Sequence, residues 1–267
     1  MEVSNHRLVG AGVTQVDTPN KSGPITPEYL IIHYTAGRSG QSSVNHFLNP
    51  AAQASAHLVI GRQGEIWQLV PFNQKAWHAG VSAWSGRSGL NSFSIGIELD
   101  NAGKLQKVGD HYQAWFGESY PESEVIEARH KNESSTSFWH AYAAEQINAV
   151  LEVGRLLVSA YRLIDVLGHD DIAPGRKVDP GPAFPMASYR ASLFGRGDDQ
   201  SPRYIVSAEL LNVRAGPGTE FSILRPPIPR GTPLELIEMG ADWAKVHIAD
   251  GSGQDGWVRN LFIKQVV

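Results

Sequence analysis

Two histidines and one aspartate in this sequence have the types and positions of metal ligands. His33 directly follows the apolar run "YLII", and His169 directly follows "DVLG". Asp179 lies in "GRKVDPGPAF", a loop stiffened by proline. Two neutral imidazoles and one carboxylate are a standard ligand set for catalytic zinc, which leaves a fourth position for water. The three residues together predict a zinc site.

Each of these residues has a simpler explanation when it is taken alone. A histidine at a strand end is often bonded to backbone at the edge of the core, and an aspartate before proline is common in turns. The metal site is favoured because both histidines leave predicted central strands, whose ends meet at one edge of an α/β sheet. Asp170 and Asp171 are expected to face solvent or to cap a helix.

Two charged residues could do chemistry beside such a metal. Glu98 lies in "SIGIELD", an alternating pattern that turns its side chain away from Ile97 and Leu99. A carboxylate on a covered sheet face is costly unless it is paired or functional, and it could deprotonate an attacking water. Lys177 could hydrogen-bond the oxyanion of a tetrahedral intermediate, although its spacing fits a solvated loop cation equally well.

The stretch "AWHAG" places Trp77 and His78 on a loop next to glycine. An aromatic ring and an imidazole there could line a substrate groove, and such a tryptophan could stack against a sugar ring. Simple packing is the alternative, and the sequence favours neither. Both residues are candidates for substrate binding.

Composition and charge limit the other possibilities. The chain has 267 residues, of which 42% are hydrophobic and 19% charged, as in an ordinary globular protein. Its net charge of -4 offers no basic surface for nucleic acid. It contains no cysteine, so any metal must be held by His, Asp or Glu. No apolar run is long enough to span a bilayer, and "MEVSNHRLVGAG" lacks the pattern of a signal peptide.

The strands and helices that must position these residues alternate along the chain. Apolar runs predict strands at 29–35, 92–100 and 163–167, and "AHLVIGRQGEIWQLVP" predicts a β-hairpin. Such alternation with helices indicates an α/β domain: a mostly buried β-sheet flanked by helices.

Two helices are expected in this domain. The first covers "SSVNHFLNP", with Ser42 or Ser43 as its cap, and the second runs from Phe138 to Tyr161 with apolar residues at helical spacing. Residues 100 to about 136 are polar, and we expect an irregular surface excursion there.

The tail has a different pattern. Residues 192–203, "SLFGRGDDQSPR", are small, polar and glycine-rich, which predicts a linker. From 204 to 267 short alternating runs are separated by Gly, Pro and Asp turns, which predicts a small all-β barrel. The first 191 residues form the predicted catalytic domain, with an N-terminal extension to about residue 28.

Five stretches carry a family resemblance: "LIIHYTAG", "AHLVIGRQGEIWQLVP", "AWHAG", "SIGIELDN" and "GHDDIAPGRKVDPGPAF". In this order they resemble the zinc-dependent N-acetylmuramoyl-L-alanine amidase family, which is related to peptidoglycan recognition proteins. The resemblance covers most of residues 28–185. In the tail, "LNVRAGPGTEFSIL" and "DGWVRNLFI" resemble the bacterial SH3-like wall-binding module.

The amidase resemblance implies that zinc is held by His33, His169 and Asp179, with Glu98 and Lys177 as catalytic residues. It implies hydrolysis of the amide between N-acetylmuramic acid and L-alanine in peptidoglycan or muropeptides. Because every catalytic position carries the family's residue type, an active enzyme is expected rather than a binding-only member. The tail would raise the local concentration of the enzyme at the cell wall.

Two alternatives stay open: a non-catalytic peptidoglycan-binding receptor, and a cytoplasmic amidase that recycles anhydro-muropeptides. The missing signal peptide favours the cytoplasm, whereas the wall-binding tail favours the cell envelope or secretion, which we slightly prefer. We expect no protein partner, no nucleic acid and no transmembrane segment.

Overall fold

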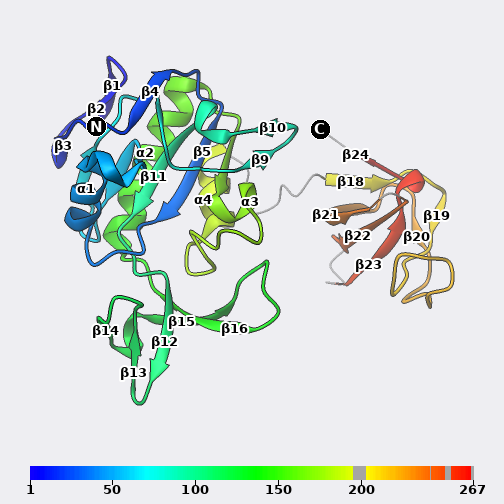
Figure 1. The fold of residues 1–267 in the computed structure, drawn as a ribbon. Coiled ribbons are helices and arrows are strands. Elements are labelled where there is room, and N and C mark those ends of the chain that lie inside the picture. Colours follow the sequence, from blue (N-terminus) through cyan, green and yellow to red (C-terminus); the bar gives the residue numbers. More distant parts are fainter. Residues whose placement is uncertain (195–202, 241, 250–253, 266–267) are drawn as a thin grey trace. The chain divides into compact units, whose positions relative to one another are not determined.

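The computed structural model describes residues 1–194, 203–240, 242–249 and 254–265 (Figure 1). The chain divides into two compact units, Met1–Phe194 and Gly195–Val267. Helix α4 (Met186–Phe194) includes residues 192–194 of the predicted linker. The rest of that linker, apart from Arg203, lies outside the described residues.

A six-stranded mixed sheet forms the centre of the first unit, in the order β17-β5-β11-β6-β7-β3. Neighbours in this order pair in parallel except β6 and β7, which are antiparallel and form the predicted hairpin. The predicted strands around β5, β11 and β17 and the α/β fold are confirmed. The bounds are β3 (Val13–Gln15), β5 (Tyr29–Tyr34), β6 (Leu58–Ile60), β7 (Ile66–Gln68), β11 (Ser94–Leu99) and β17 (Asp165–Gly168).

Alternating side chains of these strands face opposite sides of the sheet. Leu30 and Ile32 of β5 pack into the main core beneath helix α2 (Ala144–Tyr161). His33 therefore faces the other side, because successive residues of a strand alternate. Glu98 of β11 pairs in register with His33 and shares that face. The pleat of two neighbouring strands thus brings an imidazole and a carboxylate side by side.

The helices differ from the prediction at their starts. Phe138 belongs to strand β16 (Thr136–His140), where it pairs with Leu105, and α2 begins only at Ala144. The predicted start was wrong because apolar residues four apart fit a helix and the even positions of a strand alike. Helix α1 (Gly40–Leu48) is capped by Ser39, so the predicted caps within 42–43 were also wrong.

Residues 104–140 form a second sheet, and the expectation of an irregular excursion was wrong. Its strands are antiparallel in the order β14-β13-β12-β16-β15, around a small core that includes Leu105 and Tyr112. Figure 1 shows this lobe, hereafter the β excursion, extending beyond the end of β11. The sequence hid these strands because many of their side chains are exposed and polar, such as Lys104, Gln106 and Lys107 of β12. The remaining bounds are β12 (Lys104–Val108), β13 (His111–Gln113), β14 (Ser119–Tyr120) and β15 (Val125–Arg129).

The N-terminal segment is part of the first unit's core rather than a separate extension. Leu8 is fully buried, and β3 adds to the edge of the main sheet. Short strands account for most of the remaining regular structure: β1 (Glu2–Ser4), β2 (Arg7–Val9), β4 (Lys21–Pro24), β8 (Gln74–Ala76), β9 (Ala83–Trp84) and β10 (Arg87–Ser88).

The second unit is all-β, as predicted. Antiparallel strands in the order β23-β22-β21-β18-β24 enclose a core that includes Val213, Leu234 and Val246, beside the pair β19–β20. Its strands are β18 (Arg203–Val206), β19 (Leu210–Leu211), β20 (Ile228–Pro229), β21 (Pro233–Met239), β22 (Trp243–Ile248), β23 (Asp255–Arg259) and β24 (Ile263–Gln265). Among the described residues of both units, no helix is long and apolar enough to cross a membrane.

Burial of His57 makes the stability of the first unit depend on pH. The ring is fully buried, Nε2 donates to the Gln74 carbonyl at 2.9 Å, and burial lowers the pKa of His57 from 6.5 to about 4. Between pH 4 and pH 6.5, His57 is therefore protonated in the unfolded chain but not in the folded chain. We expect the free energy of unfolding to fall as the pH drops through this range, by roughly 3 kcal/mol at most for this residue.

Denaturant unfolding of chelator-treated protein at a series of pH values measures this effect. His57→Gln should be less stable than the wild type at neutral pH but should lose less stability on acidification. Parallel pH profiles for the two proteins would contradict the assignment.

Candidate metal centre

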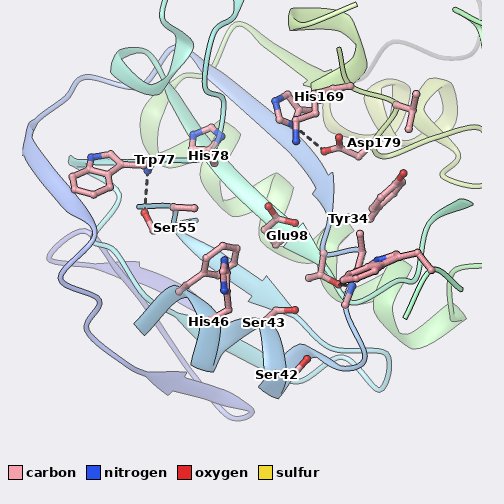
Figure 2. A pocket seen from close by; sticks show the side chains of 18 of the residues that line it. Tyr34, Ser42, Ser43, His46, Ser55, Trp77, His78, Glu98, His169 and Asp179 are labelled. Carbon is pink, nitrogen blue, oxygen red and sulfur yellow. Dashed lines mark hydrogen bonds and ion pairs between the residues drawn. The ribbon is translucent and has the colours of Figure 1, made fainter. Parts of the chain in front are cut away.

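The predicted metal ligands and Glu98 lie on or beside one face of the sheet, and Figure 2 shows three of them, Glu98, His169 and Asp179. His33 comes from β5 and Glu98 from β11. His169 follows β17 as the first residue of the short helix α3 (His169–Ile172). Asp179 lies on the next loop, which is tied to α3 because the Asp170 N–H donates to the Asp179 carbonyl at 2.9 Å.

Three side-chain atoms converge closely within this group. Nδ1 of His33 lies 2.9 Å from Nδ1 of His169, and each of these nitrogens lies 3.0 Å from Oδ2 of Asp179. All three residues are buried. Burial alone would raise the pKa of Asp179, but its contacts with His169 and His33 hold that pKa below the ordinary carboxyl value. An anionic oxygen and two imidazole nitrogens therefore converge on one small region of the site.

Hydrogen bonds behind His33 determine which of its nitrogens carries the proton. The Ser94 hydroxyl donates to the Leu90 carbonyl at 2.6 Å, so its oxygen accepts from Nε2 of His78 at 3.3 Å. Nδ1 of His78 then accepts from Nε2 of His33 at 3.0 Å. Burial lowers the pKa of His33 to about 4 and that of His78 well below 6.5, so both rings are neutral at neutral pH. Nδ1 of His33 is consequently unprotonated.

His169 is oriented in a similar way. Its Nε2 lies 3.1 Å from the Ala79 carbonyl, and when this nitrogen donates to that carbonyl, Nδ1 is left as an acceptor. In this tautomer the nitrogens of His33 and His169 and the oxygen of Asp179 meet without a hydrogen to share. Three acceptors at this spacing repel one another unless a cation lies among them. The donor set fits a metal ion, and the outward-facing nitrogens have the partners that metal-bound histidines use.

Glu98 is the second unusual group on this face. Its side chain is 9% exposed, and its Oε2 is buried without a hydrogen-bond partner. Burial, reinforced by the negative charge of Asp179, raises the pKa of Glu98 well above the usual 4.5, while the charge of Lys177 partly opposes the shift. A carboxyl group with a raised pKa next to a cavity is suited to accept and return a proton.

A cavity of about 620 Å³ connects these residues to solvent. Glu98, His169, Asp179 and Lys177 line it, together with predicted groove residues Trp77 and His78. Figure 2 shows Glu98 between His169 and Asp179 on one side and α1 with Ser43 and His46 on the other. The cavity can admit a substrate to the converging acceptors and to the carboxylate together.

The two predicted groove residues differ in what they contact. The indole N–H of Trp77 donates to the Ser22 hydroxyl at 3.0 Å, and its partly buried ring lines the cavity. Both nitrogens of His78 are occupied by His33 and Ser94. His78 thus orients a neighbouring imidazole, a role that the sequence reasoning missed.

A glycine signals this role in the sequence. Gly96 interrupts the apolar strand pattern, and a Cβ there would lie 2.4 Å from the ring of His78. A glycine inside a strand often marks such a close approach. The sequence does not reveal that Gly96 lies beside His78 of "AWHAG" in the fold.

Asp170 and Asp171 divide between burial and capping. Asp170 is only 5% exposed, and its Oδ2 lies 2.9 Å from Nε2 of His130, so the expectation that it faces solvent or caps a helix was wrong. The carboxylate of Asp171 accepts from the Gly168 N–H at 2.7 Å at the start of α3, as predicted for a cap. The partner of Asp170 comes from the β excursion, which explains why local sequence did not reveal it.

Buried imidazoles, a carboxylate and a cavity in this arrangement are typical of metal-dependent hydrolases. Residues 23–182 match the sequence family described as N-acetylmuramoyl-L-alanine amidase, and residues 209–264 match the bacterial SH3 domain. The chain belongs to the N-acetylmuramoyl-L-alanine amidase family and carries a bacterial SH3 domain.

Individual relatives agree with this family. The N-acetylmuramoyl-L-alanine amidase AmiD of Escherichia coli is 34% identical over 197 residues, which cover 69% of this chain and 60% of AmiD. The 1,6-anhydro-N-acetylmuramyl-L-alanine amidase AmpD of Escherichia coli is 39% identical over 140 residues, covering 52% and 57%. The chain thus spans less than two thirds of either relative. A crystal structure of a selenomethionine AmpD derivative matches with a TM-score of 0.51 and 29% identity, covering 72% of this chain and 99% of that one.

The hydrogen bonds of the buried imidazoles predict tautomers that NMR can detect. Long-range proton–nitrogen correlation spectra of the metal-free protein at neutral pH should show His78 and His57 as Nε2–H tautomers. In His57, Nδ1 accepts from the Gly96 N–H at 3.0 Å, which fixes the same order.

Ser94→Ala is the matched variant. It removes the acceptor for Nε2 of His78, so we expect His78 to populate both tautomers while His57 keeps its signals. A protonated Nδ1 on His78 in the wild type would refute the proposed direction of these hydrogen bonds.

Proposed function

We propose that this chain is a zinc-dependent amidase that hydrolyses the bond between the lactyl group of N-acetylmuramic acid and L-alanine. The observation that carries this proposal is the convergence of His33, His169 and Asp179 on the cavity that Glu98 lines. The names of AmiD and AmpD as amidases of such substrates support the bond and the substrate class. The substrate would be peptidoglycan or its soluble fragments.

His33, His169 and Asp179 would hold the zinc ion. When bound, zinc supplies Lewis-acid polarisation of the scissile carbonyl and lowers the pKa of water. The neutral nitrogens and anionic oxygen of this chain match the ligands that zinc takes in hydrolases. Because the imidazoles are oriented from behind by His78 and the Ala79 carbonyl, the site needs little rearrangement to accept the ion.

Glu98 would act as the general base and then as the general acid. It takes a proton from the attacking water and later delivers it to the leaving nitrogen of L-alanine. Its raised pKa suits both steps, because a carboxylate that binds a proton more tightly than usual is a stronger base and can hold the proton until the leaving nitrogen takes it. This role explains why a carboxylate is kept on a buried sheet face at a cost in stability.

Lys177 would stabilise the negative charge that develops on the carbonyl oxygen. It lines the same cavity, and its positive charge partly opposes the rise in the pKa of Glu98 that burial causes. Trp77 would contact the substrate from the cavity wall. His78, which the sequence suggested as a substrate-binding residue, would act instead by positioning His33.

The second unit would bind cell wall and keep the enzyme close to its substrate. The match to a bacterial SH3 domain supports this tethering role. AmpD is named for 1,6-anhydro substrates, and this favours a second candidate, an amidase of soluble anhydro-muropeptides. Retention of Glu98 and Lys177 in the cavity argues against a binding-only receptor.

Intact sacculi and soluble anhydro-muropeptides separate the two enzymatic candidates. Purified protein is incubated with each, with and without a chelator, and the products are identified by mass spectrometry. We expect free stem peptide with an L-alanine amino terminus, no product with chelator, and recovery after addition of zinc. Lack of stem peptide from both substrates would refute the enzymatic proposal.

Two substitutions should separate zinc binding from proton transfer. Asp179→Ala removes the anionic ligand, so we expect the zinc affinity to fall by about 100-fold or more. Glu98→Gln should keep zinc stoichiometry in a metal assay but reduce kcat by roughly 10²–10⁴-fold. Unchanged zinc content in Asp179→Ala would contradict the ligand assignment.

The acid limb of the pH–rate profile should respond to Lys177. Loss of the lysine charge removes an interaction that favours the ionised form of Glu98, so Lys177→Met should shift the apparent pKa of this limb upward. Activity rises with pH through this limb, because Glu98 must lose its proton to act as a base. Lys177→Arg is the control that keeps the charge, and a downward shift in Lys177→Met would contradict the assignment.

A further inference from the structure

The β excursion carries an exposed tryptophan at the mouth of the catalytic cavity. Trp115 lies on the turn between β13 and β14, and its side chain is 78% exposed. It is the most exposed of the large aromatic side chains in the described part of the chain. It also lines the 620 Å³ cavity with Glu98 and Asp179. An aromatic ring exposed at the edge of a cavity offers an apolar face to a molecule that enters it.

Trp115 is exposed but fixed in place. Its indole N–H donates to the Ala36 carbonyl at 2.8 Å, three residues after the proposed zinc ligand His33. Arg38 donates to the Phe116 carbonyl at 2.8 Å and lies over the Phe116 ring, 5.3 Å from its centre. The turn is thus anchored to the segment that leaves β5. The polar edge of the indole is tied down, whereas its apolar ring remains largely exposed.

The turn itself is also rigid. The Gly117 N–H donates to the Ala114 carbonyl at 2.9 Å, and the Ala114 N–H donates to the Glu118 carbonyl at 2.8 Å. Ala114 and Tyr112 are buried in the core of the β excursion. Little conformational freedom therefore remains to be lost when a ligand lies on the ring, which favours binding.

The neighbouring side chains indicate the chemistry of the ligand. Thr35, Ser42 and Ser43 line the same cavity, and their hydroxyl groups donate to backbone carbonyls and can accept hydrogen bonds from a ligand. A pyranose ring has an apolar C–H face that stacks on an aromatic ring, and hydroxyl or acetamido groups at its rim that bond to such side chains.

We propose that Trp115 is a stacking platform for a sugar ring of the glycan portion of the substrate. The β excursion then sets specificity, because it favours substrates that carry saccharide beside the cleaved amide. This inference rests on the proposed amidase function, but it concerns binding and can be tested without cleavage.

Binding is measured by calorimetry in a Glu98→Gln background, so that no turnover occurs. The probes are an N-acetylglucosaminyl-N-acetylmuramoyl peptide and the same stem peptide without sugar. Trp115→Ala should weaken binding of the saccharide-bearing probe by roughly 10-fold and leave the free stem peptide unaffected. Trp115→Phe, which keeps an aromatic face, should retain most of the affinity.

Val108→Ala is the matched control. Val108 is an exposed apolar residue on β12 of the same excursion and is outside the cavity lining. The Val108→Ala variant should bind both probes with the same affinity as the Glu98→Gln parent. Near-ultraviolet circular dichroism and thermal unfolding check the fold of each variant, and Trp115→Phe serves as the test if Trp115→Ala does not fold.

Equal weakening for both probes would overturn the proposal in favour of a peptide contact. Unchanged binding of the saccharide-bearing probe in Trp115→Ala, or a loss as large in Val108→Ala, would also overturn it. Cleavage by the protein with Glu98 intact is scored separately. Normal sugar-dependent binding without any cleavage would reject the amidase proposal alone, and cleavage without an effect of Trp115 would reject this inference alone.

Discussion

The surrounding structure has to hold three atoms together that repel one another: Nδ1 of His33, Nδ1 of His169 and Oδ2 of Asp179. These atoms lie 2.9 to 3.0 Å apart in a buried site, and hydrogen bonds from the far side of each ring to His78 and the Ala79 carbonyl direct the ring protons away from them. A flexible chain would separate them. Here two neighbouring parallel strands lead to the histidines, and a loop bonded to α3 carries the aspartate. The rigid sheet therefore keeps the three side chains in position to bind a cation.

The direction of the hydrogen bonds behind the site matters as much as the ligands themselves. Because the Leu90 carbonyl can only accept, the hydroxyl of Ser94 donates to it, and the direction of every later bond toward His33 follows. Gly96 makes room for the imidazole in the middle of this series. Glu98, in register with His33, has an Oε2 without a hydrogen-bond partner, and burial raises the pKa of this carboxyl group. The same sheet face thus holds a hydrogen-bonded series of side chains and a buried acid.

The β excursion is attached to both sides of this centre. Near His33 it contacts the main domain through Trp115 and the Ala36 carbonyl, and near His169 through His130 and Asp170. Both contacts lie close to residues that carry the converging nitrogens. The excursion therefore braces the ends of β5 and β17 while it forms part of the cavity wall. A lobe that looks peripheral in Figure 1 contributes to the position of the site and to its shape.

Local sequence was sufficient for those features that depend on neighbouring residues. Continuous apolar runs identified β5, β11 and β17, and the histidines at their ends identified the edge where ligands meet. It was insufficient where long-range pairing decided the structure. The pairing of β12 with β16, the burial of Asp170 by His130, and the bond between His78 and His33 join residues 33 to 45 positions apart. Periodicity and residue type determine a strand and its faces, because these depend on the backbone alone. Which side chains share a proton, and which acid is left without a partner, is decided only when distant segments pack together and exclude water.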